Sequence, residues 1–345
     1  MPEKKNVYWI NAVKAIAIIA VFLSHVQAIY GYSIGLVHRF ISPWYVNAFF
    51  FVSGYLLFRK QLSEPIVEQS EQQYFSRTGG GQILLINVLM RIVLPSILFA
   101  AIEFFPSSLM QGRGIDMVNF AYKTIGGGTY WFTSALAVSE IIELFLLTTR
   151  IKNIWFYFLT SLVIGLMGMS YQNGMYRQEF WAWHRGIIAV MFLGFGGLYW
   201  RYENVISKYF RRCYITTGLM VLYTAILLCC KNTNPNISIL SLQPLGIVTT
   251  LFACVLLIEL CKVLPENRIV NYIGQNTLGF YFMSGALPIV VSMLAHKLIS
   301  GSYLVVMLAD WIICLILAYA FVKLINRWLP WMFDFKKMNL KNKQL

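Results

Sequence analysis

The sequence INAVKAIAIIAVFLSHVQAIYGYSIGLVHRFISPWYVNAFFFVSGYLLF, residues 10–58, predicts two apolar helices joined by a short loop. The first helix carries one lysine and one histidine in an otherwise apolar run. Lys14 and His25 are 11 residues apart, which at about 100° per residue is within roughly 20° of three full turns. Their side chains therefore share one helix face. They lie about 16 Å apart along its axis, a little over half of a bilayer's hydrocarbon thickness.

The composition is typical of a membrane protein. The 345 residues are 58% hydrophobic and 12% charged, about half the charge of a soluble domain. Apolar runs that are long enough, or nearly so, to cross a bilayer recur to the end of the chain. We predict an all-α, polytopic helical bundle of about ten transmembrane helices, with residues 1–345 as a single transmembrane domain. The predicted spans are 9–30, 43–58, 83–105, 129–148, 154–171, 184–200, 213–230, 244–263, 269–295 and 303–325.

The basic residues predict the orientation of the bundle. With the N-terminus inside, 19 of the 28 Lys and Arg residues fall in cytoplasmic segments and 7 in outer segments. Because cytoplasmic loops are enriched in Lys and Arg, both termini are predicted to be cytoplasmic, and residues 328–345 form a basic cytoplasmic tail. The net charge of +14 then reflects topology, and we expect a lipid bilayer but no nucleic acid as a partner. The predicted location is a multi-pass cell membrane of the bacterial inner-membrane type.

The six cysteines lie mostly inside apolar runs and lack the spacing of metal ligands. They are interpreted as small hydrophobic residues, so no metal is expected.

Ionisable residues inside membrane spans are informative because each is costly at the bilayer centre unless paired or hydrated. Glu140 and Glu143 are three residues apart and share a helix face, so either could neutralise a buried cation. The candidate cations are Lys14 and Arg91. An alternative stays open, in which Lys14 snorkels toward the cytoplasm and His25 is an ordinary interior histidine.

A second set of acids is predicted at the depth of His25. Asp310 lies in the outer half of the last span, and Glu103 lies near the outer end of the third. Either carboxylate could orient the imidazole, as in many acid–base sites.

An aromatic stretch, QEFWAWHRG, precedes the sixth span on the predicted outer side. It places Trp181, Trp183, His184 and Arg185 close together. Aromatic rings beside a guanidinium suit stacking and hydrogen bonding to a sugar, and an aromatic belt with one basic residue gives the same letters. Both readings stay open.

The first two segments resemble the membrane acyltransferase 3 family. Its first span usually reads Asp-x-x-Arg followed after ten residues by His, and its second contains Phe-Phe-x-x-Ser-Gly-Tyr. The corresponding residues here are Asn11, Lys14, His25, Phe50, Phe51, Ser53, Gly54 and Tyr55. Weaker matches follow in the right order at residues 91–95 (RIVLP), at 130–136 (YWFTSAL) and at 273–281 (IGQNTLGFY).

Two departures from the family pattern stand out. Lys14 stands where the family usually has arginine, and Asn11 stands where it usually has aspartate. A planar ion pair thus becomes a single charge with a neutral partner. The family also often has a second histidine after the late tyrosine, where this chain has Ser284.

The resemblance implies an enzyme, an O-acetyltransferase. It would move an acyl group, commonly acetyl from cytoplasmic acetyl-CoA, to a sugar hydroxyl of a surface or envelope glycan or its lipid-linked precursor. His25 would act as general base or, alternatively, as a transient acyl carrier. The other expected roles are donor binding by Lys14, Arg91 and Asn11, oxyanion hydrogen bonds from Ser53 and Tyr55, and acceptor binding by Trp131, Trp183, His184 and Arg185.

A different class of function is a transporter or flippase for a glycan or lipid-linked sugar. In that case Lys14, His25 and Asp310 would line a substrate or proton path. A sensor or scaffold explains the buried charges less well. The oligomeric state, including a homodimer, is left open by the sequence.

Overall fold

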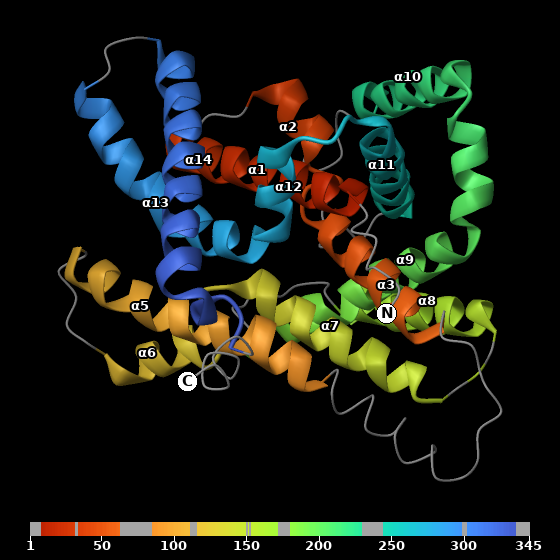
Figure 1. Cartoon of the computed structure of the whole chain (residues 1–345), viewed down its shortest axis with the longest axis horizontal. Helices are drawn as coiled ribbons and strands as arrows, with labels where there is room; N and C mark the ends of the chain where they lie inside the picture. The colour runs from red at the N-terminus through yellow and green to blue at the C-terminus, as the bar shows by residue number, and fades with distance from the viewer. Residues whose placement is uncertain are drawn as a thin grey trace. The chain divides into compact units, whose positions relative to one another are not determined.

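The computed structural model describes residues 8–31, 34–62, 85–110, 116–149, 151, 153–171, 180–229, 244–298 and 302–335. Within these residues every regular element is a helix (Figure 1), which confirms the predicted all-α class. The end of the predicted basic tail, residues 336–345, lies outside the described residues. The elements are α1 (Tyr8–Tyr30), α2 (Gly35–Ile41), α3 (Asn47–Leu62), η1 (Leu89–Val93), α5 (Leu94–Met110), α6 (Met117–Thr124), α7 (Trp131–Leu147), α8 (Ile154–Tyr171), η2 (Phe180–Ala182), α9 (Trp183–Phe210), α10 (Cys213–Cys229), α11 (Pro244–Val263), α12 (Arg268–Gln275), α13 (Thr277–Leu298), α14 (Tyr303–Trp328) and η3 (Pro330–Met332).

Several of these helices are long and apolar enough to cross a membrane. By length and composition, 5 described stretches qualify: Tyr8–Tyr30, Leu85–Pro106, Gly246–Val263, Thr277–Ala295 and Tyr303–Trp328. A sixth candidate is the pair Phe180–Phe210 and Tyr214–Cys229, which is bent by 103°. The polytopic character is therefore supported, while the count of ten spans stays a prediction.

The chain forms two compact units. Unit 1 comprises Met1–Phe49 and Asn204–Ile325, and unit 2 comprises Phe50–Glu203 and Asn326–Leu345. The boundaries fall within the helices α3, α9 and α14.

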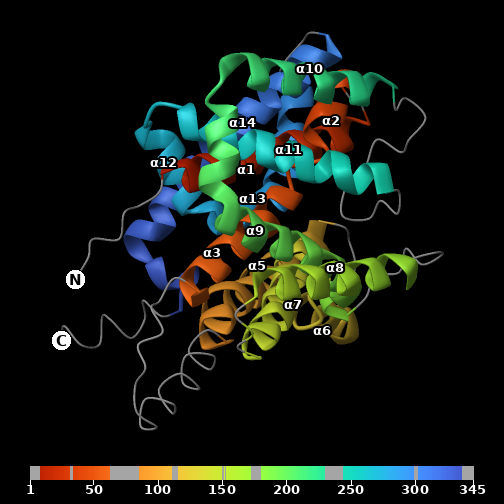
Figure 2. The same ribbon diagram turned by 90° about the vertical axis from the view of Figure 1, so that its right-hand side faces the viewer.

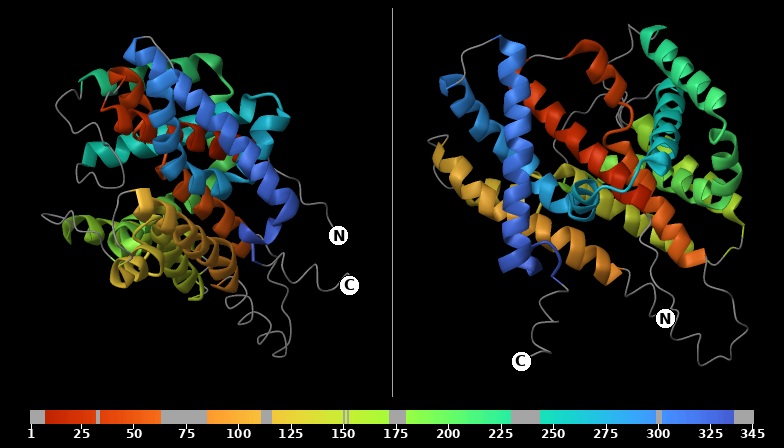
Figure 3. Two further views of the ribbon diagram at one scale, coloured as in Figure 1. Left: turned by 90° about the vertical axis from the view of Figure 1, so that its left-hand side faces the viewer. Right: turned by 45° about the horizontal axis from the view of Figure 1, so that its top comes forward.

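In unit 1, α1 packs against α11, α12 and α13 (Figure 3). Helix α10 lies beside α11 (Figure 2). A Cβ atom at Gly274 of α12 would collide with the backbone of Asn11, so only glycine permits this approach of α12 to α1. At its other end α1 buries Val26 and Tyr30 with Ala295, Val306 and Met307. The helix that carries Lys14 and His25 is thus held at both ends.

The ninth predicted span, 269–295, is not one helix. Helix α12 ends at Gln275 and α13 begins at Thr277, because Asn276 leaves the helical conformation with φ −111° and ψ 23°. Its side chain donates to the Tyr272 carbonyl at 2.8 Å, and the Thr277 hydroxyl donates to the Gly274 carbonyl at 2.7 Å. The Thr277 hydroxyl thus satisfies a carbonyl at the end of α12, and the Asn276 side chain adds a second bond to the Tyr272 carbonyl, which also accepts from the Asn276 amide at 3.1 Å.

In unit 2, α3 and α9 approach closely at two glycines. A Cβ at Gly54 would overlap the backbone of Leu193, and a Cβ at Gly196 would overlap the carbonyl of Phe51. Small residues allow backbones to come together in this way in membrane helices. The Ser-Gly-Tyr segment of α3 is therefore fixed by backbone contact with α9.

We expect Gly196→Ala to lower the free energy of unfolding by about 1–3 kcal/mol, because overpacking forces the backbones of α3 and α9 apart. Gly218→Ala in α10 is the control, since a Cβ there meets nothing within 4 Å. The control should be neutral or stabilising by up to about 1 kcal/mol. Thermal unfolding in detergent measures both variants, and equal melting temperatures would contradict the packing argument.

Candidate active site

His25 is half-buried on α1, and its ring is bonded to the backbone of α13. Its Nδ1 lies 2.5 Å from the carbonyl oxygen of Ser284. A carbonyl can only accept a hydrogen bond, so Nδ1 carries the proton, and in the neutral ring Nε2 carries the lone pair. Nε2 makes no hydrogen bond to any residue that the structure describes. The imidazole is thus held in the tautomer that can accept a proton at Nε2.

Lys14 lies three turns before His25 on the same continuous helix. Its side chain is half-buried, and in the described part of the chain its ammonium group makes no hydrogen bond or ion pair. A cation held in a largely apolar bundle without a protein partner is suited to bind an anionic or carbonyl-bearing ligand.

Asn11 anchors the start of α1. Its Nδ2 donates to the Oδ1 of Asn271 in α12 at 2.7 Å, and Asn11 is 5% exposed. Where the family usually has a carboxylate beside a guanidinium, this chain has an amide pair between two helices. Asn11 therefore positions the helix that carries Lys14.

The two acids of α7 bond to hydroxyl groups within unit 2. Glu140 accepts a hydrogen bond from Ser53, and Glu143 accepts one from Ser161 at 2.9 Å. Arg91 pairs with Asp334 at 3.2 Å. Among the described residues the partner of Arg91 is thus Asp334, and neutralisation of Lys14 or Arg91 by these glutamates stays a prediction.

The two acids predicted at the depth of His25 contact other residues. Cys314 donates to Asp310 at 3.1 Å, and Tyr30 lies beside Asp310. Glu103 accepts from the Tyr130 hydroxyl at 2.7 Å. The group that orients His25 is a backbone carbonyl, where a carboxylate had been expected.

Ser53 and Tyr55 each bond to an acid, in the close-packed segment of α3. The Tyr55 hydroxyl donates to Glu203 at 2.6 Å, and Ser53 bonds to Glu140. Neither acid could be assigned to these residues from the sequence.

Arg91 lies in a single π-helical turn, η1. Such turns are rare and are often found at functional sites. Asp334, which follows the short helix η3, supplies its partner, and the Phe335 amide donates to the Met90 carbonyl at 3.1 Å. The arginine side chain remains 58% exposed and so accessible to a ligand.

The predicted acceptor residues separate into two groups. The Arg185 guanidinium lies over the ring of Trp131 at 4.5 Å, and Trp183 is 40% exposed. His184 is buried, and its Nε2 is 2.8 Å from the Gly168 carbonyl of α8. Trp131, Trp183 and Arg185 can therefore present a surface to a ligand, whereas His184 ties α9 to α8.

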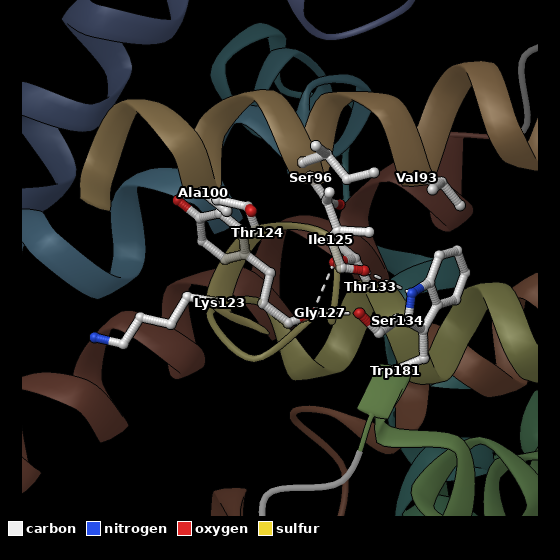
Figure 4. Close-up of a pocket in the computed structure, with 12 residues that line it drawn as sticks. Val93, Ser96, Ala100, Lys123, Thr124, Ile125, Gly127, Thr133, Ser134 and Trp181 are labelled. Carbon is white, nitrogen blue, oxygen red and sulfur yellow. Dashed lines mark hydrogen bonds between the residues drawn. The ribbon is translucent and has the colours of Figure 1, made fainter. Parts of the chain in front are cut away.

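Trp181, which was not singled out for a separate role, lines a small pocket of unit 2 (Figure 4). Its backbone has φ 57°, and its amide and indole N–H groups donate to the carbonyls of Gly126 and Ile125, both at 2.7 Å. Ser96 and Thr133 on the same pocket donate to their own helix or turn carbonyls, which leaves their oxygen lone pairs as acceptors. The glycine run at 126–128 was the available sequence signal for this turn.

Within the described residues no group of three or more His, Cys, Asp or Glu side chains could hold a metal ion.

Comparison with protein families identifies the family of the chain. The family profile described as an acyltransferase domain, Acyl_transf_3, matches residues 7–333. The chain belongs to the acyltransferase 3 family. The predicted recognition is therefore confirmed, and membrane acyltransferase activity follows for this chain at the level of the family. Neither the curated proteins nor the solved structures give a match.

A double-mutant cycle tests the amide pair at the start of α1. Asn11→Ala and Asn271→Ala should each destabilise the protein by about 1–3 kcal/mol, because the first leaves the half-buried Asn271 amide unpaired and the second leaves the buried Asn11 amide unpaired. The double variant should cost less than the sum, with a coupling of at least about 0.5 kcal/mol in thermal or denaturant unfolding. Additive effects would show that the two amides do not act together.

Proposed function

We propose that this acyltransferase is an O-acetyltransferase that moves acetyl from cytoplasmic acetyl-CoA to a sugar hydroxyl of a surface or envelope glycan or its lipid-linked precursor. The observation that carries the proposal is the bond between His25 and Ser284 in a chain of this family. The proposal includes ten spans in a bacterial-type inner membrane, with both termini cytoplasmic. It treats residues 1–345 as one transmembrane domain.

His25 is the general base of the proposed reaction. Its Nε2 accepts the proton of the sugar hydroxyl while the oxygen attacks the thioester carbonyl. The C–S bond then breaks, and the imidazolium returns the proton to the departing CoA sulfur. Nδ1 keeps its bond to the Ser284 carbonyl throughout, so the ring holds its orientation and the positive charge that forms is stabilised.

Lys14 binds the donor in this account. Its half-buried ammonium, without a described protein partner, supports a role in attracting the phosphates or a carbonyl of acetyl-CoA. Asn11 fixes the helix on which Lys14 sits, and the exposed guanidinium of Arg91 offers a second cation. Ser53 and Tyr55 supply hydrogen bonds to the tetrahedral oxyanion, with Glu140 and Glu203 orienting their hydroxyl groups.

The acceptor sugar binds at Trp131, Trp183 and Arg185. The stacked Arg185–Trp131 pair supports this assignment, because a flat aromatic and guanidinium surface suits the apolar face and hydroxyl groups of a sugar. His184 contributes by holding the start of α9 in place.

We expect His25→Ala to lower acetyl transfer from labelled acetyl-CoA to membrane glycan by about 10²–10⁴-fold, the usual contribution of a general base. His38→Gln is the matched control, because His38 is a second histidine of unit 1 and bonds to Gln27. The control should retain transfer. Transfer by His25→Ala at the wild-type rate would exclude His25 as the base.

We expect Lys14→Ala to raise the apparent donor KM about tenfold or more, because a hydrogen bond to a charged group contributes about 1.5–3 kcal/mol. Lys14→Arg should bind the donor nearly as well, since it keeps the charge. Lys208→Ala removes an exposed lysine of α9 and serves as the control. Steady-state kinetics at varied acetyl-CoA gives the answer, and an unchanged KM in Lys14→Ala would remove Lys14 from the donor site.

A further inference from the structure

Helix α13 contains a proline in its interior, Pro288. In an α-helix the N–H of each residue bonds to the carbonyl four residues earlier. Proline has no N–H, so the carbonyl of Ser284 loses its partner in the helix. This is the same carbonyl that accepts the hydrogen bond from His25 Nδ1.

Ser284 lies where a backbone carbonyl without a hydrogen bond would be costly. Ser284 is 0% exposed, and an unpaired carbonyl at membrane depth would cost several kcal/mol. The Ser284 hydroxyl donates to the Tyr281 carbonyl at 2.8 Å and so takes no part in the bond to His25. The carbonyl and the imidazole therefore satisfy each other.

We propose that Pro288 is a positioning residue for His25: by withholding its N–H, it reserves the Ser284 carbonyl for Nδ1 and keeps Nε2 as the base. This inference rests on the proposed function of His25. In general a proline ring also crowds the carbonyl four residues before it, which favours tilting that carbonyl away from the helix axis. Both effects leave the Ser284 carbonyl available to His25 on α1.

The consequence of adding an N–H is a competition for one oxygen. The carbonyl oxygen could accept both bonds, but the new helix bond would draw the carbonyl toward the helix axis and share its negative charge, and so weaken the bond to Nδ1. The ring would then also populate the tautomer with the proton on Nε2, which cannot accept a proton there. In such a variant the rate of acetyl transfer should fall, while the affinity for the donor stays the same.

The test compares Pro288→Ala with Pro106→Ala. Pro106 also lies inside a helix, α5. The carbonyl that loses its helical N–H partner there belongs to Ile102, which is 48% exposed. Pro288→Ala should lower kcat for acetyl transfer roughly tenfold and leave the apparent donor KM unchanged. This loss is smaller than the loss of about 10²–10⁴-fold expected when the general base itself is removed. Pro106→Ala should change neither.

A spectroscopic measurement separates positioning from a general loss of structure. The chain has 4 histidines, so ¹⁵N spectra of histidine-labelled protein can be assigned with His25→Gln. At a pH of about 8.5, roughly two units above the ordinary imidazole pKa, wild-type His25 should carry its proton on Nδ1. Pro288→Ala should show a population with the proton on Nε2, and Pro106→Ala should not.

An ester at position 288 provides the rescue. Lactic acid, the α-hydroxy analogue of alanine, removes both the proline ring and the N–H. If the missing N–H is what matters, the ester should restore kcat and the Nδ1 tautomer relative to Pro288→Ala. An ester that stays as slow as Pro288→Ala would overturn the proposal.

The failure of this inference can be told apart from failure of the proposed function. Wild-type protein that transfers no acetyl would contradict the function, and the tautomer measurement would still decide the role of Pro288. A Pro288→Ala variant with wild-type kcat and a wild-type tautomer would overturn the inference alone.

Discussion

The hydrogen bond between His25 and the Ser284 carbonyl is the interaction on which the functional account depends. It joins two helices of unit 1, determines which ring nitrogen carries the proton, and satisfies a carbonyl that α13 leaves unpaired. The rest of unit 1 supports it. Helix α12 meets α1 at Gly274 and Asn11, and α13 and α14 pack against the far end of α1, so the helix that carries His25 is held at both ends.

Much of the fold could be predicted because apolar helices leave a direct sequence pattern. The segment with Lys14 and His25 is one continuous helix, as its periodicity indicates, and the all-α class follows from composition. The break at Asn276 was not predicted, since a run of apolar residues continues on both sides of it. Its cause is local, in side chains that bond to the carbonyls of α12.

The partners of the charged residues could not be predicted. Depth in a membrane can be estimated from position along a span, but depth does not say which helices are neighbours. The hydrogen bonds of Glu140, Glu143 and Asp310 with Ser53, Ser161 and Cys314 therefore had no signal in the sequence, and the pairing of these acids with a buried cation stays a prediction. The orienting group of His25 was missed for another reason: every residue has a carbonyl, and only the proline four residues later marks this one.

The central claim is that the protein consumes acetyl-CoA to acetylate a glycan, and thiol release tests it most directly. Purified protein in lipid nanodiscs would be incubated with acetyl-CoA and extracted envelope glycan, and free CoA thiol would be measured together with glycan-bound acetyl. The account predicts that both appear in equal amounts and that both are lost in His25→Ala. Movement of unmodified glycan across a vesicle membrane, without thiol release, would contradict it.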